Sequence, residues 1–450
     1  MSTDFDVIVI GGGPAGEVCV GQLADGGLRV ALVERELVGG ECSYWGCIPS
    51  KTLLRPGEAL AAAREAPGAR EAATGALDAA AAFEWRDFMV SDHDDAGALP
   101  WLEERGIELV RGAGRLDGPG AVVVGDERLT ARHVVIATGS EPVVPPIPGL
   151  RELDGLWTNR EATAVTEVPR RLLILGAGAV GVEMGQALHR MGAQVVIVEG
   201  MEHVLPREPR PLGEALGDAL AADGIELRFG QFAGAARRED GEYVLEFPDG
   251  TQLRGDRLLV AAGRRPRTQG LGLETAGVGV TRRGIEVDAR LSAGDGVWAI
   301  GDVTGIWPLT YVGKYQARIA AANILGERRE ASYDAVPRIV FTDPHAAAVG
   351  ASEGAQTGTV AMSAVPRTAT YTRAYAERKG FLTLVSDGEK LTGAYALGPE
   401  AGEWLQQATL AIRARVPLAV LRDTIQPFPT FSEAFVDALA GLGAQVPAAA

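Results

Sequence analysis

The order of apolar and polar positions near the N-terminus predicts a β-strand, a helix and a second β-strand. Phe5–Ile10 (FDVIVI) is a short apolar run, and the glycine-rich turn Gly11–Gly16 follows it. A segment of helical length then leads to a second apolar run, Arg29–Val33, which is followed by Glu34. Short buried strands on either side of a glycine turn and a helix are typical of a βαβ unit.

The same arrangement occurs a second time in the middle of the chain. Arg171–Leu175 (RLLIL) precedes the glycine turn Gly176–Gly181, and Gln194–Val198 is the second apolar run. Glu199 follows that run at the same spacing from its glycines as Glu34 has in the first copy. The repeat predicts an α/β fold with two Rossmann-like, doubly wound nucleotide-binding domains.

The remaining pattern predicts how the other segments fold. The Ala-rich stretch Glu58–Phe83 is expected to form surface helices with breakers at Pro67 and Gly75. The Pro-rich stretch Glu141–Gly149 is expected to cross from the first nucleotide-binding domain to the second. From Ala335 onward, alternating apolar and polar runs and then helices predict a further α+β domain. The predicted boundaries divide the chain into residues 1–150, 151–267, 268–334 and 335–450.

Composition and charge narrow the class of protein. A chain of 450 residues is expected to form two to four domains, and its 46% hydrophobic and 23% charged residues are ordinary for a soluble protein. The net charge of −16 argues against a nucleic-acid partner, because phosphate binding requires a basic surface. No apolar run is long enough to span a membrane, and the acidic start lacks a basic leader. A cytoplasmic enzyme acting on a small molecule is expected.

The two glycine turns predict two dinucleotide sites. In each copy the first glycine allows the tight turn, the second lets the backbone approach a pyrophosphate, and the third allows close helix–strand packing. These glycines are Gly11, Gly13 and Gly16 in the first copy, and Gly176, Gly178 and Gly181 in the second. For either copy alone, a glycine turn without a ligand is the alternative. Glu199 suits the 2′-hydroxyl of NAD, so NADH is favoured although Arg207 is close in sequence.

The pair Cys42 and Cys47 needs an explanation of its own, since the chain has only three cysteines. A disulfide that closes so short a ring constrains the unfolded chain little and is a poor structural staple. Pro49 and Ser50 are typical of a helix start, which places Cys47 where the helix dipole stabilises a thiolate. A metal site and two unrelated buried thiols are the alternatives, and a redox-active pair is favoured over both.

The segment around this pair carries a family resemblance. Gly39–Lys51 (GGECSYWGCIPSK) resembles the C-x4-C active site of the pyridine nucleotide–disulfide oxidoreductases, which include dihydrolipoamide dehydrogenase, glutathione reductase and mercuric reductase. Further motifs of that family are matched by Ala137–Ser140, Ala262–Pro266, Ala299–Asp302 and Phe341–Pro344. The resemblance implies that residues 1–150 and 268–334 bind FAD, that residues 151–267 bind NAD(P)H, and that residues 335–450 form the dimerisation domain of a homodimer.

The resemblance also implies roles for individual residues. Cys47 is the thiol that faces the flavin, and Cys42 is the interchange thiol that faces the acceptor. Lys51 and Glu183 resemble the ion pair beside the reactive nitrogen of the flavin, and Ala179 replaces a gating tyrosine. The expected FAD-binding residues are Gly11, Gly13, Pro14, Ala15, Gly16, Glu34, Gly40, Glu41, Cys42, Cys47, Lys51, Thr138, Gly139, Ser140, Gly301 and Asp302. The expected NAD-binding residues are Gly176, Gly178, Ala179, Val180, Gly181, Glu183, Glu199 and Gly263, and no metal site is expected.

The chain departs from the family pattern near its C-terminus. The disulfide reductases end in His-x-His-Pro-Thr-x-Ser-Glu, whereas Gln426–Glu433 reads QPFPTFSE, with Phe428 at the position of the catalytic histidine. None of the five histidines lies in this segment. Losing general acid–base catalysis costs about 10²–10⁴-fold. Exchange with dithiol substrates should therefore be slow, and Glu433 is the remaining candidate base.

This departure leaves the identity of the acceptor open among a disulfide, a quinone and a metal complex. The aromatic residues Tyr44, Trp45, Phe428 and Phe431 either pack the dimer interface or form an apolar pocket for the acceptor. One rival hypothesis is a quinone or metal-ion reductase that reacts directly at the flavin. Another is a non-catalytic subunit of a larger complex.

Two smaller features complete the sequence reading. Glu41 stands where the family usually has threonine, which puts an extra acid near the FAD phosphates, with no effect predicted. Cys19 lies early in the first predicted helix, on its expected buried side, and is expected to be a packing residue.

Overall fold

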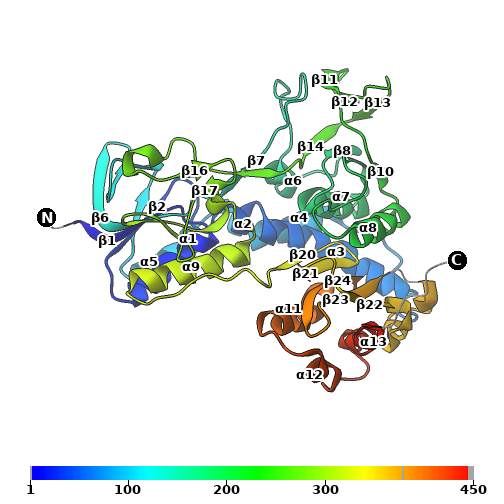
Figure 1. Ribbon diagram of the computed structural model, residues 1–450. Coiled ribbons are helices and arrows are strands. Elements are labelled where there is room, and N and C mark those ends of the chain that lie inside the picture. The colour runs from blue at the N-terminus through cyan, green and yellow to red at the C-terminus, as the bar shows by residue number, and fades with distance from the viewer. Residues whose placement is uncertain (1–2, 378–379, 444–450) are drawn as a thin grey trace. The chain divides into compact units, whose positions relative to one another are not determined.

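The computed structural model describes residues 3–377 and 380–443. The chain forms two compact units, each assembled from separate segments (Figure 1). Unit 1 comprises Met1–Pro49, Glu84–Val143 and Gly263–Ser332, and unit 2 comprises Ser50–Phe83, Val144–Ala262 and Tyr333–Ala450. The predicted domain boundaries after residues 150, 267 and 334 stay predictions.

Unit 1 is built on a sheet of eight strands whose central order is β18-β19-β6-β1-β2-β3. Strands β1, β2, β3, β6 and β19 run parallel, with Val9 of β1 opposite Leu32 of β2 and Val135 of β6. The strands of this unit are β1 Phe5–Ile10, β2 Val30–Glu34, β3 Glu108–Arg111, β4 Gly114–Leu116, β5 Ala121–Val124, β6 Glu127–Ile136, β7 Ser140–Pro142, β15 Arg264–Pro266, β16 Val280–Thr281, β17 Gly284–Ile285, β18 Ser292–Gly294 and β19 Val297–Ala299. Its helices are α1 Pro14–Asp25, α2 Gly40–Tyr44, α5 Leu99–Glu104 and α9 Thr310–Ile324.

Helices α1 and α9 pack side by side in unit 1 (Figure 1). Cys19 of α1 is fully buried, as the sequence predicts for a packing residue, among Val9, Leu32 and Ala317. The second face of the sheet is covered by a separate apolar cluster that includes Ile8. Burial on both faces explains why the strands read as continuous apolar runs.

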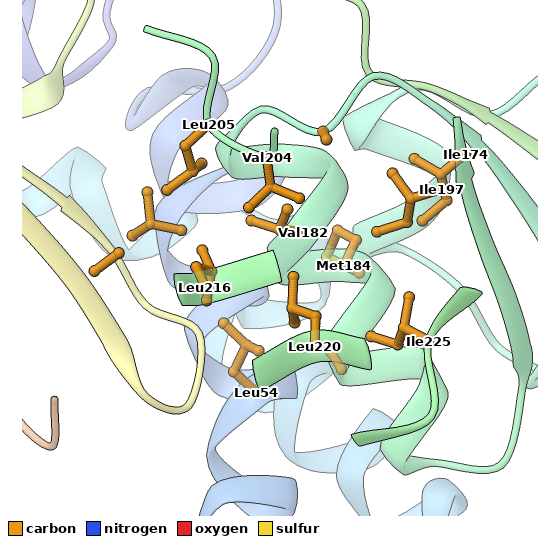
Figure 2. Packing of buried hydrophobic residues seen from close by; sticks show 14 of the residues in the cluster. Leu54, Ile174, Val182, Met184, Ile197, Val204, Leu205, Leu216, Leu220 and Ile225 are labelled. Carbon is orange, nitrogen blue, oxygen red and sulfur yellow. The ribbon is translucent and has the colours of Figure 1, made fainter. Parts of the chain in front are cut away.

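Unit 2 contains the second copy of the repeat, a parallel sheet of order β10-β9-β8-β14. Its strands are β8 Arg171–Leu175, β9 Gln194–Val198, β10 Glu226–Arg228 and β14 Arg257–Val260, with the antiparallel β11 Ala235–Glu239, β12 Glu242–Glu246 and β13 Gln252–Gly255 beside them. Its helices are α6 Asn159–Thr163, α7 Ala179–Arg190 and α8 Arg210–Asp223. Figure 2 shows the core here, where Met184 of α7 and Leu220 of α8 pack with Ile197 of β9.

The C-terminal segment of unit 2 forms a five-stranded antiparallel sheet of order β20-β21-β24-β23-β22, followed by helices. The elements are β20 Pro337–Val340, β21 His345–Gly350, β22 Gln356–Ala361, β23 Phe381–Ser386, β24 Leu391–Gly398, α10 Ala401–Trp404, α11 Gln406–Arg413, α12 Leu418–Arg422 and α13 Ala434–Gly441. The alternating pattern from Ala335 onward therefore predicts the correct elements.

The structure agrees with the prediction for the Ala-rich stretch. Helix α3 covers Cys47–Glu65 and α4 covers Ala79–Met89, and the chain between them forms turns and bends around the predicted breakers Pro67 and Gly75. The crossover Glu141–Gly149 begins as strand β7, which pairs antiparallel with β15 in unit 1.

Among the described residues, no helix combines the length and the apolar character needed to cross a bilayer.

Candidate flavin and disulfide site

The glycine turn of unit 1 can form only because two of its positions lack side chains. Gly11 has φ +110°, and a Cβ there would collide with the carbonyl oxygen of Ala137. A Cβ at Gly16 would collide with the carbonyl oxygen of Gly11. Helix α1 begins at Pro14, and its cap residue, Gly13, provides no capping side chain. The first N–H groups of α1 are therefore not capped by a side chain, and they fit the phosphates of a dinucleotide.

The acids that end the second strand of each copy make the same contacts. One Glu34 carboxylate oxygen accepts the N–H of Gly12 at 2.6 Å, and the other accepts the N–H of Glu36 at 2.7 Å. Glu199 accepts the N–H of Ala177 at 2.8 Å and that of Met201 at 3.0 Å. Each acid thus fixes its glycine turn against its second strand, and the sequence repeat extends to individual hydrogen bonds.

The other residues expected to bind FAD form a connected group in unit 1. Ser140 donates to a carboxylate oxygen of Asp302 at 2.6 Å, and the Thr138 hydroxyl donates to the carbonyl of Arg267 at 2.8 Å. Gly139 and Gly301 both have positive φ, of +72° and +77°. Burial raises the pKa of Asp302, while the Ser140 hydrogen bond and the Arg264 charge act against that rise. A partly buried carboxyl and glycine positions without side chains, all in one unit, fit the sugar and phosphate groups of FAD.

The two cysteines lie at the ends of a tight turn in unit 1. Cys42 is in helix α2 and Cys47 begins helix α3, with their Sγ atoms 2.7 Å apart. Gly46 between them favours this close approach, because a Cβ there would lie 3.2 Å from the Cα of Cys42 and 3.0 Å from the carbonyl oxygen of Glu41. The pair is close enough to form a disulfide with a small shift. Among the described residues, no group of three or more His, Cys, Asp or Glu side chains could hold a metal ion.

Thr310, the first residue of helix α9, contacts both sulfur atoms. Its hydroxyl donates to Cys42 Sγ at 3.2 Å and lies 3.4 Å from Cys47 Sγ. The pKa of Cys42 is raised by its hydrogen bond to Cys47 and by burial, and the Thr310 hydrogen bond lowers it. Complete burial also raises the pKa of the Cys19 thiol, to about 12. Cys19 differs from the pair in having no exposed surface, whereas Cys42 and Cys47 are partly exposed, so the reaction of thiols with a reagent in solution reports on the pair.

Thr310→Val should slow the alkylation of the reduced pair at neutral pH. Valine keeps the volume of threonine but removes the hydroxyl that lowers the pKa of Cys42, so that pKa rises further. The measurement is the pH profile of the iodoacetamide reaction, whose apparent pKa should move upward. Thr310→Ser keeps the hydroxyl and serves as the control. An unchanged profile in the valine variant would show that the hydroxyl has no influence on the sulfurs.

Lys51 and Glu183 form a close ion pair in unit 2. Lys51 Nζ lies 2.7 Å from a Glu183 oxygen, and Glu183 is almost fully buried in helix α7. The other Glu183 oxygen accepts the N–H of Phe341 at 2.9 Å, and the Lys51 ammonium lies 4.7 Å from the Phe341 ring centre. Ser50 also donates to Glu183, at 3.4 Å. The carboxylate therefore holds the lysine in one place, as the predicted pairing requires.

The C-terminal segment that departs from the family pattern also lies in unit 2. Phe428 is 71% exposed, whereas Phe431 is buried with its ring centre 5.2 Å from that of Tyr371. Glu433 has a buried carboxylate oxygen, Oε2, without a hydrogen-bond partner among the described residues. Phe431 thus packs inside its own unit. The Phe428 ring is exposed, and the Glu433 carboxylate oxygen can still accept a hydrogen bond.

Of the two aromatic residues between the cysteines, one is buried and the other is partly exposed. Tyr44 is buried and donates to the carbonyl of Val38 at 3.0 Å. Trp45 is half-buried, and its ring centre lies 5.5 Å from that of His93. Tyr44 therefore serves packing, and Trp45 is the aromatic residue of this turn that remains partly accessible.

The predicted residues divide between the two units. The unit 1 set comprises Gly11, Gly13, Pro14, Ala15, Gly16, Glu34, Gly40, Glu41, Cys42, Cys47, Thr138, Gly139, Ser140, Gly263, Gly301 and Asp302. The unit 2 set comprises Lys51, Gly176, Gly178, Ala179, Val180, Gly181, Glu183, Glu199 and Glu433. Gly263, expected to bind NAD, belongs to unit 1, where its carbonyl accepts the N–H of Val143.

Sequence reasoning did not find Thr310 or the role of Phe341. Thr310 is 268 residues away from Cys42 in the chain, and a threonine that opens a helix carries no local sign of a sulfur partner. Phe341 lies in a family motif, but it contributes its backbone N–H to Glu183, which its residue type does not reveal.

Comparison with known proteins identifies the relatives of this chain. Residues 5–319 match the pyridine nucleotide-disulphide oxidoreductase family, and residues 336–439 match the dimerisation domain of that family. The chain is 38% identical to a dihydrolipoyl dehydrogenase from Thermus scotoductus, over 98% of both chains. It is 32% identical to a mercuric reductase from Staphylococcus aureus, over 96% of this chain and 81% of that protein.

A solved structure agrees with the same assignment. The Cu(II) complex of the HOCl-induced flavoprotein disulfide reductase RclA from Escherichia coli is 28% identical, with a TM-score of 0.86 over 98% of this chain and 99% of that one. The predicted α/β fold, the use of FAD with NAD(P)H and the oxidoreductase function are thereby confirmed at the level of the family. The chain belongs to the pyridine nucleotide-disulphide oxidoreductases and carries their dimerisation domain.

Proposed function

We propose that this protein passes electrons from NAD(P)H through FAD and the Cys42–Cys47 pair to a thiophilic metal ion, with NADH as the preferred donor. When bound, FAD would accept hydride from the nicotinamide and pass two electrons to the sulfur pair. In this proposal Cys47 is the sulfur nearest the flavin and Cys42 is the sulfur that meets the acceptor. Lys51, held by Glu183, stabilises negative charge on the flavin, and the Glu34 and Glu199 turns hold the two dinucleotides.

The sulfur pair of this chain would store the two electrons between the donor and the acceptor, so that the electrons balance over the cycle. Hydride transfer brings two electrons, which break the bond between Cys42 and Cys47 and leave one thiol and one thiolate. Two Cu(II) ions that each accept one electron would be reduced to Cu(I), the sulfur–sulfur bond would form again, and the thiol proton would leave to solvent. Thr310 keeps both sulfurs in place during this exchange.

The observation that supports a metal acceptor is the exposed Phe428 in the C-terminal segment. Exchange with a dithiol or disulfide substrate requires a proton at the leaving sulfur, and phenylalanine cannot supply one. Reduction of a metal ion by thiolates needs no such proton, and soft sulfur ligands favour Cu(I). The relatives named mercuric reductase and the Cu(II) complex of RclA act on or bind thiophilic metals by name, which supports the same choice.

The test is an anaerobic reduction followed by a panel of acceptors. NADH should bleach the flavin absorption of the purified yellow protein, and free thiols should appear at Cys42 and Cys47. The reduced protein should then turn over with Cu(II) or Hg(II), and only slowly with lipoamide and glutathione disulfide. Rapid lipoamide turnover would contradict the metal assignment, and a protein that binds no flavin would contradict the whole proposal.

A quinone that reacts directly at the flavin is the second candidate function. The partly accessible Trp45 favours it, because a planar ring can stack on an indole. A homodimer is also part of the proposal, supported by the dimerisation domain. Cytoplasmic localisation is supported by the small number of cysteines, since catalytic disulfides are the usual kind in a reducing compartment.

A further inference from the structure

Glu41 lies directly beside the glycine turn expected to hold the FAD pyrophosphate. It is in the first turn of helix α2, between Gly40 and Cys42. Gly40 packs so closely on that turn that an added Cβ would lie 2.6 Å from the Cα of Gly13. An uncompensated carboxylate at this position would repel a pyrophosphate and lower the affinity for the cofactor.

Arg264 supplies the compensating charge. Its guanidinium nitrogen Nη2 lies 3.0 Å from Glu41 Oε2, and the two side chains are 27% and 19% exposed. Such partial burial makes the pair stronger than an ion pair on the open surface. Both residues belong to unit 1, although they are far apart in the sequence.

The Arg264 guanidinium is also linked, through Ser140, to the partly buried carboxyl of Asp302. Arg264 donates from Nε to the Ser140 hydroxyl at 2.9 Å and from Nη2 to the Ser140 carbonyl at 3.0 Å. Ser140 in turn donates to Asp302 at 2.6 Å. The Arg264 charge lowers the pKa of Asp302 and the Glu41 charge raises it, so the two charges act on Asp302 in opposite senses.

We propose that Glu41 and Arg264 are a compensated charge pair that determines how tightly this chain holds FAD, with Arg264 required because Glu41 is present. The inference rests on the proposed function in that the glycine turn of unit 1 binds FAD. The consequence that distinguishes this proposal is that the effects of replacing Glu41 and of replacing Arg264 on the free energy of FAD binding are not additive. Loss of Arg264 alone leaves the negative charge of Glu41 uncompensated next to the glycine turn, whereas loss of both residues removes the repelling charge and the charge that compensates it.

The experiment measures the FAD dissociation constant of the flavin-depleted full chain by flavin fluorescence. Arg264→Gln should weaken FAD binding roughly tenfold or more, within the range of coupling between contacting charged residues. Glu41→Thr should bind FAD at least as tightly as the parent protein. The double variant should return to within about threefold of the parent, as coupled charges require.

Two further variants separate charge from folding. Arg265→Gln removes a neighbouring arginine that is itself 57% exposed and pairs with Glu141, and it should leave FAD affinity unchanged. Arg264→Lys keeps the charge and should retain most of the affinity, so the proposal remains testable if Arg264→Gln does not fold. A double variant as weak as Arg264→Gln, or a lysine variant as weak as the glutamine variant, would overturn the pairing. Absence of flavin from the parent protein would instead overturn the proposed function.

Discussion

Replacing Cys42 by serine should stop electron transfer to the metal acceptor while leaving the reduction of the flavin by NADH intact. A serine oxygen cannot form and break a bond with Cys47, so the two-electron store between flavin and acceptor is lost. Removing the reacting atom of a covalent catalyst costs on the order of 10³–10⁶-fold in turnover. The measurement is steady-state turnover with Cu(II) or Hg(II), beside stopped-flow bleaching of the flavin by NADH.

Ser43→Ala is the matched control for this variant, since Ser43 is the next residue of helix α2 and carries no thiol. It should keep both rates. Retained quinone turnover in Cys42→Ser would show that quinones react directly at the flavin, as the rival function requires. Retained metal turnover would contradict the role of the pair, and the inert Cys19 could not account for it, because its thiol is completely buried.

The two βαβ units were predictable because their strands are buried on both faces. Strands β1, β8 and β9 have the bounds read from the apolar runs, and β2 differs by one residue at each end. The glycine turns were predictable because positions such as Gly11 and Gly176 have positive φ and a backbone oxygen where a Cβ would be. Local sterics determine both features, so a single sequence contains them.

The contacts that hold the site together were less predictable, since they join distant segments. The sequence placed Glu34 at the end of its strand, but its two hydrogen bonds to the glycine turn depend on tertiary packing. Thr310 reaches the sulfurs from a helix that is remote in sequence. Glu41 was visible as a departure from the family pattern, and its partner Arg264 lies in Ala262–Pro266, another of the family motifs. The residue types at these two positions do not reveal that the side chains form an ion pair.

Phe428→His should increase turnover with lipoamide or glutathione disulfide, by up to about 10²–10⁴-fold. The resemblance places a proton-transferring histidine at this position, and Phe428 is 71% exposed, so the imidazole should fit without disturbing the core. Glu433, which in the family pattern orients the histidine, retains a buried oxygen without a partner among residues 3–377 and 380–443. The measurement is the pH dependence of disulfide turnover, which should acquire a group that titrates near the ordinary histidine pKa of about 6.5.

The control for this gain is Phe428→Asn, which brings a polar side chain to the same position but cannot transfer a proton at neutral pH. It should show no gain with disulfides. Adding Glu433→Gln to the histidine variant should remove part of the gain, because a neutral amide no longer stabilises the imidazolium. Turnover with metal ions should stay unchanged in all three variants, since thiolate oxidation by a metal needs no proton at position 428. Equal rates for the histidine and asparagine variants with every disulfide would mean that the slow step lies elsewhere, and that Phe428 does not determine the choice of acceptor.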